Sequence, residues 1–291
     1  MFYTIQNKHL TVKVNQKGAE LTAVTGADGC EYLWCGDETY WEEHSPWLFP
    51  ICSHLYKNQY TYRGKTYELP DRAFLHSSDF ECLVHADDTL VLKLSATEES
   101  RALYPFDFTF TVAYRLVGNR LQITVTVGNE GDEVMPFAFG AHPGFNVPFS
   151  GKAKFDDFYL EFGEECSPDK FLFTDEVFLN GKKEYFPLKE NRRFDLSHDL
   201  FVIDGIFLSR VANEISLKSD LDPHSVTVRF PKTPYLGFWT NPEVHGPFVC
   251  IEPWHGLPSV DGIIDDLDTK NDMYRLQPGA KKTFDLEYIF N

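Results

Sequence analysis

Residues 106–127 read FDFTFTVAYRLVGNRLQITVTV, and this stretch decides the fold. Aromatic or β-branched residues occupy every second position from Phe106 to Tyr114, with polar or small residues between them. After the Gly118-Asn119 pair the same alternation continues over 121–127. A period of two is typical of a strand with one buried face, and a Gly-Asn pair is typical of a tight turn. We therefore expect a long antiparallel hairpin.

Shorter runs with strand character recur along the rest of the chain. They lie at residues 10–14, 60–68, 89–95, 225–230 and 283–289. No amphipathic pattern is long enough for a helix of more than about two turns. Many short strands separated by turn residues predict a sandwich or barrel. No change in composition marks a linker, so we expect one all-β domain over residues 1–291, although the length alone would allow two.

Composition and charge exclude several classes of partner. The chain has 27 basic and 44 acidic residues, a net charge of −17, which disfavours nucleic acid and anionic membrane surfaces. It opens with MFYTIQNKHL, which lacks the pattern of a secretory signal, and no apolar run is long enough to span a membrane. The six cysteines show no CxxC spacing. We expect a cytoplasmic protein with free thiols.

Familiar cofactor and metal motifs do not occur. The sequence has no GxxxxGK[ST], GxGxxG, GxSxG or HExxH. His245 and His255 flank Glu252, but this spacing is a weak indication of a metal site, and surface or supporting histidines are the better interpretation. We expect neither a metal nor a cofactor.

A carboxylate interrupts one strongly apolar segment. Residues 248–254 read FVCIEPW, in which Glu252 follows what looks like a buried strand. Buried strands rarely tolerate an unpaired charge. Glu252 is therefore either an exposed strand end or a functional group that lines a cleft.

Two further segments place polar residues beside apolar ones. His142 lies in GAHPGF, directly after the apolar run MPFAF. It is either a core histidine whose ring nitrogens have hydrogen-bond partners or a residue of a functional site. The segment LFPICSH ends at His54, and DRAFLH at 71–76 contains Arg72 and His76. Two interpretations explain these last two segments about equally well: an exposed loop with a few basic residues, or a binding site.

Taken in order, these and other segments resemble the aldose 1-epimerase (galactose mutarotase-like) family, in particular its LacX-type branch. The likeness covers nearly the whole chain, and its strength lies in the ordered series of motifs. They are GAEL at 18–21, EYLW at 31–34, LFP at 48–50, YRGKTY at 62–67, HPGF at 142–145, PYLGFW at 234–239 and CIEPW at 250–254.

The resemblance implies a β-supersandwich of antiparallel strands and a cleft in which α and β anomers of an aldose interconvert. It implies that Glu252 is the general base, His142 the general acid and Asp204 a ligand of sugar hydroxyls. Such an isomerase needs neither metal nor cofactor, because ring opening requires only one proton removed and one delivered. Trp239 and Trp254 offer either a flat apolar face to the sugar or ordinary core packing.

The chain departs from the family pattern among its basic residues. His54 stands where the family has a substrate-binding arginine, Arg72 stands at its first active-site histidine, and His76 stands at the next arginine. This departure has two explanations. Either the activity has been lost, or the basic hydrogen-bond donors have moved to other positions in the cleft, where they bind another sugar or a sugar phosphate. We therefore expect a mutarotase of an aldohexose or hexose phosphate, acting as a monomer or homodimer.

Two other functions stay open. A carbohydrate-binding protein without turnover would keep the cleft and explain the altered basic residues. A glycosidase is the least favoured, because glycosidases usually use two carboxylates and only one of the two proposed proton-transfer groups is acidic.

Overall fold

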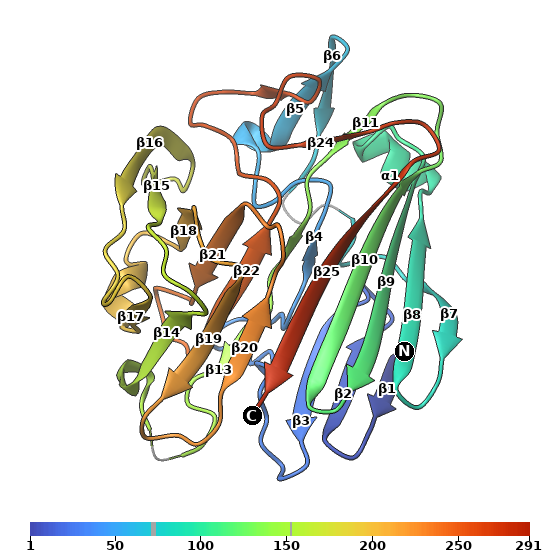
Figure 1. Cartoon of the computed structure of the whole chain (residues 1–291). Helices are drawn as coiled ribbons and strands as arrows, with labels where there is room; N and C mark the ends of the chain where they lie inside the picture. The colour runs from blue at the N-terminus through green and yellow to red at the C-terminus, as the bar shows by residue number, and fades with distance from the viewer. Residues whose placement is uncertain (71–73, 152) are drawn as a thin grey trace.

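The computed structural model describes residues 1–70, 74–151 and 153–291, so Arg72 lies outside the described residues. Two large antiparallel sheets form most of the molecule (Figure 1). Strands predominate because alternating apolar residues give most segments one face to bury. The all-β supersandwich expected from the sequence is confirmed.

The first large sheet has nine strands and contains the hairpin at 106–127. Its ladder runs from the pair Phe108–Asn129 to the pair Val117–Arg120, and Gly118 takes a φ of +62° in the turn between. In spatial order the strands are β17 (Arg193–Asp195), β14 (Phe158–Phe162), β19 (Glu214–Ser219), β20 (Val226–Arg229), β25 (Lys281–Phe290), β10 (Arg120–Asn129), β9 (Phe108–Val117), β8 (Thr89–Ser95) and β7 (Glu81–His85).

The second large sheet has eight strands, and β22 near its centre is buried along its whole length. In spatial order the strands are β16 (Leu179–Tyr185), β15 (Asp169–Phe173), β18 (Ile206–Ser209), β21 (Tyr235–Trp239), β22 (Phe248–Trp254), β12 (Gly140–Ala141) and β4 (Trp47–Leu48), while β13 (Gly144–Asn146) also pairs with β22.

Smaller elements complete the fold. The strands form three small sheets, made of β1 (Phe2–Gln6), β2 (Leu10–Asn15) and β3 (Leu21–Gly26), of β23 (Asp265–Asp266), β5 (Gln59–Tyr62) and β6 (Lys65–Glu68), and of β11 (Met135–Phe137) and β24 (Tyr274–Leu276). The helices are α1 (Glu98–Leu103) and the 3-10 turns η1 (Tyr56–Asn58), η2 (Phe155–Asp157) and η3 (His198–Phe201). Among the described residues, no helix is both long and apolar enough to cross a membrane.

Aromatic residues join the two large sheets across a common core. Phe139, next to β12, stacks on Phe284 of β25 with ring centroids 4.6 Å apart. Phe145 of β13 meets Tyr288 of β25 edge-on at 5.7 Å. Such buried rings contribute large apolar areas, so the contact between the sheets stabilises the fold. The expected free state of the six cysteines is also found.

Candidate active site

Strand pairing brings His142 and Glu252 together. Gly140 of β12 pairs with Trp254, and Gly144 of β13 pairs with Cys250. Residue 142 lies midway between the two glycines and residue 252 midway between their partners, so the register alone sets the two residues opposite one another. The turn is fixed further by the His142 backbone N–H, which donates to the Pro46 carbonyl at 3.1 Å.

The two side chains lie at ion-pair distance, and they form an ion pair when His142 is protonated. Nε2 of His142 lies 3.3 Å from Oε2 of Glu252. The side chain of Glu252 is 1% exposed, whereas that of His142 is 18% exposed and faces the opening. Glu252 is thus buried within β22 and not at an exposed strand end. A buried carboxylate needs such compensation because desolvation disfavours its charge.

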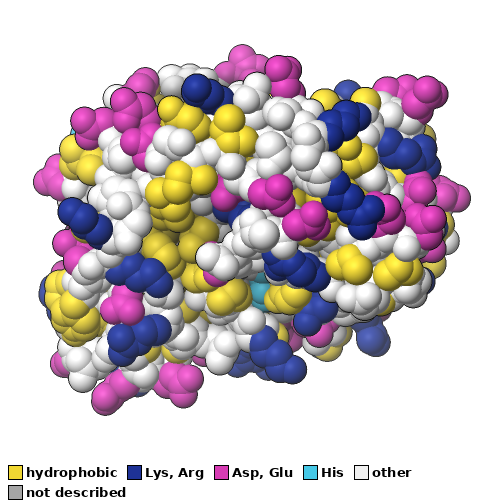
Figure 2. Space-filling model, turned by 90° about the horizontal axis from the view of Figure 1, so that it is seen from above, with side chains coloured by type: hydrophobic (Ala, Val, Ile, Leu, Met, Phe, Trp, Pro, Cys, Tyr) yellow, Lys and Arg dark blue, Asp and Glu magenta, His cyan; other side chains and the backbone are white. Residues whose placement is uncertain are grey.

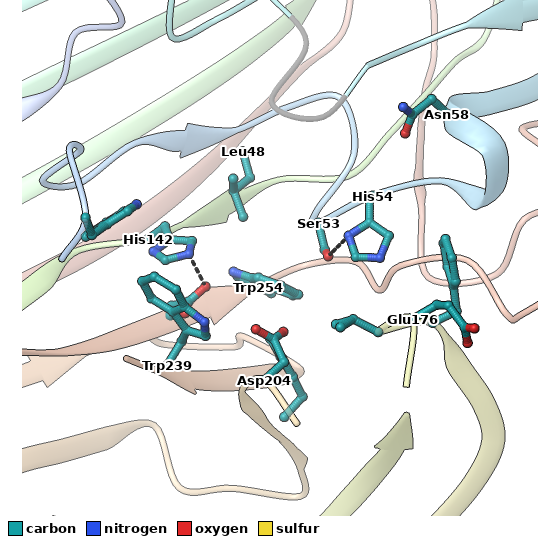
Figure 3. A pocket seen from close by; sticks show the side chains of 14 residues that line it. Leu48, Ser53, His54, Asn58, His142, Glu176, Asp204, Trp239 and Trp254 are labelled. Atoms are coloured by element: carbon teal, nitrogen blue, oxygen red, sulfur yellow. Dashed lines mark hydrogen bonds and ion pairs between the residues drawn. The ribbon is translucent and has the colours of Figure 1, made fainter. Parts of the chain in front are cut away.

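Glu252 and His142 lie in a cavity of about 470 Å³ that opens to the surface (Figure 3). Cavities of this size bury small organic ligands in other proteins. The residues that line it are Trp41, Leu48, Ser53, His54, Asn58, His142, Glu176, Val177, Phe178, Asp204, Phe207, Trp239, Glu252 and Trp254.

Three tryptophans surround the ion pair. The ring centroid of Trp41 lies 5.1 Å from that of His142, and Trp239 meets the same imidazole edge-on at 5.7 Å. Trp254 packs on Phe207 at 4.5 Å. The indole nitrogens of Trp41 and Trp254 are buried and have no hydrogen-bond partner among the described residues.

Asp204 follows η3 and points into the same cavity. Burial raises the pKa of its carboxyl above the ordinary range. The backbone N–H of Gly205, the Trp239 side chain and the charge of His54 favour the ionised form and partly offset this effect on the pKa. A desolvated carboxylate beside an indole is suited to accept hydrogen bonds from ligand hydroxyls.

The structure separates the basic residues that the sequence grouped. His54 lines the cavity, where its Nδ1 lies 3.1 Å from the hydroxyl of Ser53 and its ring meets Phe178 edge-on at 4.8 Å. His76 is exposed and is not among the described residues that line the cavity. Arg72 lies outside the described residues, so its relocation into the cleft stays a prediction.

Several lining residues were not foreseen from the sequence. Trp41 lies in a segment without a clear pattern, and the loop 174–178 brings Glu176, Val177 and Phe178 from a distant part of the chain. A usable signal existed for Leu48 and Ser53, because both belong to the segment LFPICSH, which was already singled out.

Metal-ligating residues group differently from the weak pattern in the sequence. Within the described part of the chain, ligand atoms of His142, Cys250 and Glu252 all lie within 4.8 Å of one another. His255 is buried elsewhere, where its ring nitrogens lie 3.2 Å from the Thr233 hydroxyl and 2.8 Å from the Tyr274 hydroxyl. His245 stacks on His198 at 4.6 Å. His245 and His255 therefore do not form a site with Glu252.

The fold and the cleft place this chain in the class of galactose mutarotase-like proteins. The galactose mutarotase related enzyme from Lactobacillus acidophilus superposes with a TM-score of 0.94 at 33% identity, over 100% of this chain and 97% of that one. A galactose mutarotase-like protein from Lactobacillus casei superposes with a TM-score of 0.93 at 31% identity, over 100% of both chains.

The chain belongs to the aldose 1-epimerase family, whose model matches residues 1–288. Protein LacX of Lactococcus lactis subsp. lactis is 30% identical over 99% of this chain and 100% of its own length. The family-level expectation of an isomerase of the aldose 1-epimerase type is thereby supported.

Proposed function

We propose that this protein is an aldose 1-epimerase that interconverts the α and β anomers of an unphosphorylated aldohexose. The observation that carries the proposal is the contact of 3.3 Å between His142 and Glu252 in the wall of an open cavity. Membership of the aldose 1-epimerase family supports the same reaction.

The ion pair supplies both proton transfers that the reaction needs. Ionised Glu252 removes the proton of the anomeric hydroxyl while protonated His142 delivers one to the ring oxygen, and the bond between C1 and the ring oxygen breaks. The aldehyde rotates about its C1–C2 bond and presents its other face. Ring closure then reverses both transfers and restores the ion pair. Each positioned proton transfer contributes a factor of about 10²–10⁴.

The other lining residues suit a sugar. Asp204, whose carboxylate points into the cavity, accepts hydrogen bonds from ring hydroxyls. Trp239, beside His142, offers apolar surface to the C–H groups of the ring.

The charges around the cavity favour a neutral sugar over a sugar phosphate. Its described lining holds three carboxylates, those of Glu176, Asp204 and Glu252, and two imidazoles, but neither lysine nor arginine. Phosphate sites normally use arginine, lysine or backbone N–H groups. On the face shown in Figure 2, basic side chains are interspersed with acidic ones. Hexose 6-phosphate is therefore the second candidate substrate, and it depends on Arg72.

Saturation-transfer NMR tests the reaction directly. We expect wild type to accelerate exchange between the anomers of glucose or galactose more than those of glucose 6-phosphate. Glu252→Gln and His142→Asn should each lower kcat by about 10²–10⁴-fold. Glu164→Gln and His9→Asn, which change exposed residues away from the cavity, are matched controls.

A lack of acceleration for all three sugars would contradict the proposal. If sugars still shifted the resonances of the cleft, the protein would be the carbohydrate-binding alternative, in which His54 replaces the substrate-binding arginine and turnover is lost.

A further inference from the structure

The GAEL segment at residues 18–21 is not among the described residues that line the cavity, and the proposed proton transfers do not use it. It forms a tight bend directly before β3, in which Gly18 and Ala19 take φ values of +72° and +47°. A positive φ is uncommon for a residue with a side chain such as Ala19. The bend brings the Ala19 carbonyl and the Glu20 carboxylate to residues 44–47, which follow more than twenty positions later in the chain.

The carboxylate of Glu20 holds the beginning of the segment 44–47. Its Oε1 accepts hydrogen bonds from the backbone N–H groups of His44 at 2.8 Å and of Ser45 at 3.0 Å. Nδ1 of the His44 imidazole lies 3.5 Å from the same oxygen. Burial alone would raise the pKa of the Glu20 carboxyl, but the hydrogen bonds and the charge of His44 outweigh burial and lower this pKa. Glu20 is therefore ionised at neutral pH and is a strong acceptor.

The carbonyl of Ala19 holds the other end of the segment 44–47. It accepts hydrogen bonds from the indole N–H of Trp47 at 3.2 Å and from the hydroxyl of Tyr114 at 2.7 Å. Trp47 and Tyr114 are both buried. Two consecutive residues of the bend, Ala19 and Glu20, thus tie the segment 44–47 at both of its ends.

The segment 44–47 in turn supports the turn that carries His142. The His142 backbone N–H donates to the Pro46 carbonyl at 3.1 Å, and the Gly144 backbone N–H donates to the His44 carbonyl at 2.9 Å. On the other side of the turn, β12 pairs with β4. The backbone on both sides of His142 therefore rests on the segment that the bend holds.

A single residue, His44, connects Glu20 with the turn. Its N–H donates to the Glu20 carboxylate and its carbonyl accepts from the turn. Glu252 is held separately, because its strand β22 pairs with β21. A shift of the segment 44–47 would thus change the distance of 3.3 Å between His142 and Glu252. Misplacement of a catalytic group by about 1 Å can lower a rate about 10²-fold.

We propose that Glu20 is a positioning residue for the anomer exchange: through the backbone of residues 44–46 it sets the placement of His142 against Glu252. The inference rests on the proposed function and adds to it a residue outside the described lining of the cavity. Because Glu20 acts on the acid/base pair and not on the sugar, its loss should lower kcat and leave KM nearly unchanged.

Three substitutions of Glu20 separate the reach of its hydrogen bonds from its charge. Glu20→Gln keeps an acceptor oxygen at the same reach and loses the charge, Glu20→Asp keeps the charge but is one methylene too short, and Glu20→Ala removes the acceptor. By saturation-transfer NMR we expect kcat to fall roughly 10–100-fold in Glu20→Ala and roughly tenfold in Glu20→Asp. Glu20→Gln should stay within about threefold of wild type, and so should KM in all three variants.

Two controls distinguish positioning from a general loss of stability. Val24→Ala removes buried apolar atoms from β3 of the same small sheet, so it should destabilise the fold and keep the wild-type kcat. In a chain that already carries His142→Asn, Glu20→Ala should lower kcat no further, because its effect passes through His142. A loss of kcat in Val24→Ala equal to that in Glu20→Ala, or a full further loss in the double variant, would overturn the proposal.

A measurement on the imidazole of His142 tests the placement without any turnover. Its proton–carbon resonance, identified by its absence from His142→Asn, should shift in Glu20→Ala and Glu20→Asp and stay in place in Val24→Ala. A shifted resonance in a protein that exchanges no anomers would support the positioning by Glu20 and contradict the proposed reaction. An unshifted resonance would overturn the positioning and leave the reaction standing. If Glu20→Ala does not fold, a greater loss of kcat in Glu20→Gln than in Glu20→Asp would overturn it.

Discussion

Nε2 of His142 lies 3.3 Å from Oε2 of Glu252, although the two residues come from distant parts of the chain. The pairing of β12 and β13 with β22 sets this distance, because it fixes the backbone on both sides of each residue. The contact pairs a nearly buried carboxylate with a more exposed imidazole, and it is the pair to which we assign the two proposed proton transfers.

If the two groups act as a unit, their substitutions will not be additive. Glu252→Gln combined with His142→Asn should lower kcat little more than either single change, because neither remaining group can complete the exchange alone. Anomer exchange measured for all three variants checks this. A double variant whose loss is the product of the two single losses would show that the residues act independently.

Asp204 should contribute to binding at a cost in stability. Burial raises the pKa of its carboxyl, so between its unfolded and folded values the folded chain binds more protons and stability falls as pH rises. We expect Asp204→Asn to raise the free energy of unfolding at pH 7 and to raise the KM for the sugar roughly tenfold.

Urea unfolding and exchange kinetics on the same preparations measure the two effects of Asp204→Asn. Asp199→Asn, near the start of η3, changes a neighbouring exposed carboxylate and serves as control. A variant that is both less stable and unchanged in KM would contradict the assignment.

Because His255 is buried, we expect the free energy of unfolding to fall in acid. Its pKa is lowered to about 4, first by burial and then by the charge of Lys282. Between this value and the unfolded value of about 6.5, the unfolded chain binds more protons, so stability rises with pH across the window and falls as pH drops through it. The wild-type contribution should be roughly 2–3 kcal/mol over that range.

The measurement for His255 is urea unfolding at several values between pH 4 and 7.5. His255→Gln should show a shallower dependence on pH than wild type, whatever its absolute stability, because it cannot titrate. His9→Gln, at an exposed position, should keep the wild-type slope. Identical slopes for all three proteins would rule out this role of His255.

Sequence patterns predicted the strands better than the cleft. The hairpin at 106–127 was predictable because each strand buries one face and so alternates in polarity. Glu252 stood out because a carboxylate in a buried strand demands compensation. The same reasoning could not find Trp41 or Phe178. Tryptophan and phenylalanine are also common in protein cores, so their presence does not distinguish the wall of a cavity from ordinary packing. Their part in the cavity depends on loop conformation and on contacts between distant segments, for which a single sequence has no periodic signal.

Zinc should inhibit the protein. Imidazole, thiolate and carboxylate are all zinc ligands, and His142, Cys250 and Glu252 offer one of each within 4.8 Å. Zn²⁺ held there would block the acid/base pair, whereas Mg²⁺, which prefers oxygen ligands, should have little effect. Cys250→Ser should weaken inhibition roughly tenfold, and a chelator should restore activity. Equal inhibition of wild type and Cys250→Ser would exclude the thiol as a ligand.

Gly140 should be required for the shape of the cavity, because it leaves room for two side chains that line it. A Cβ atom there would lie 2.7 Å from Cδ1 of Trp254 and 3.2 Å from Cδ1 of Leu48, both residues of the cavity lining. We expect Gly140→Ala to push these side chains towards the sugar, lowering the free energy of unfolding by about 1–3 kcal/mol and raising KM.

Urea unfolding and anomer exchange of Gly140→Ala check both effects, and Gly151→Ala is the control because a Cβ there meets no atom within 4 Å. Adding Leu48→Ala to Gly140→Ala removes one of the three side chains that the new Cβ would crowd, which are Trp254, Cys52 and Leu48, so it should lower the KM again while leaving the fold destabilised. A Gly140→Ala protein with wild-type stability and KM would show that Trp254 and Leu48 can move without disturbing the cleft, and that the close approach of β12 to β22 is not what shapes it.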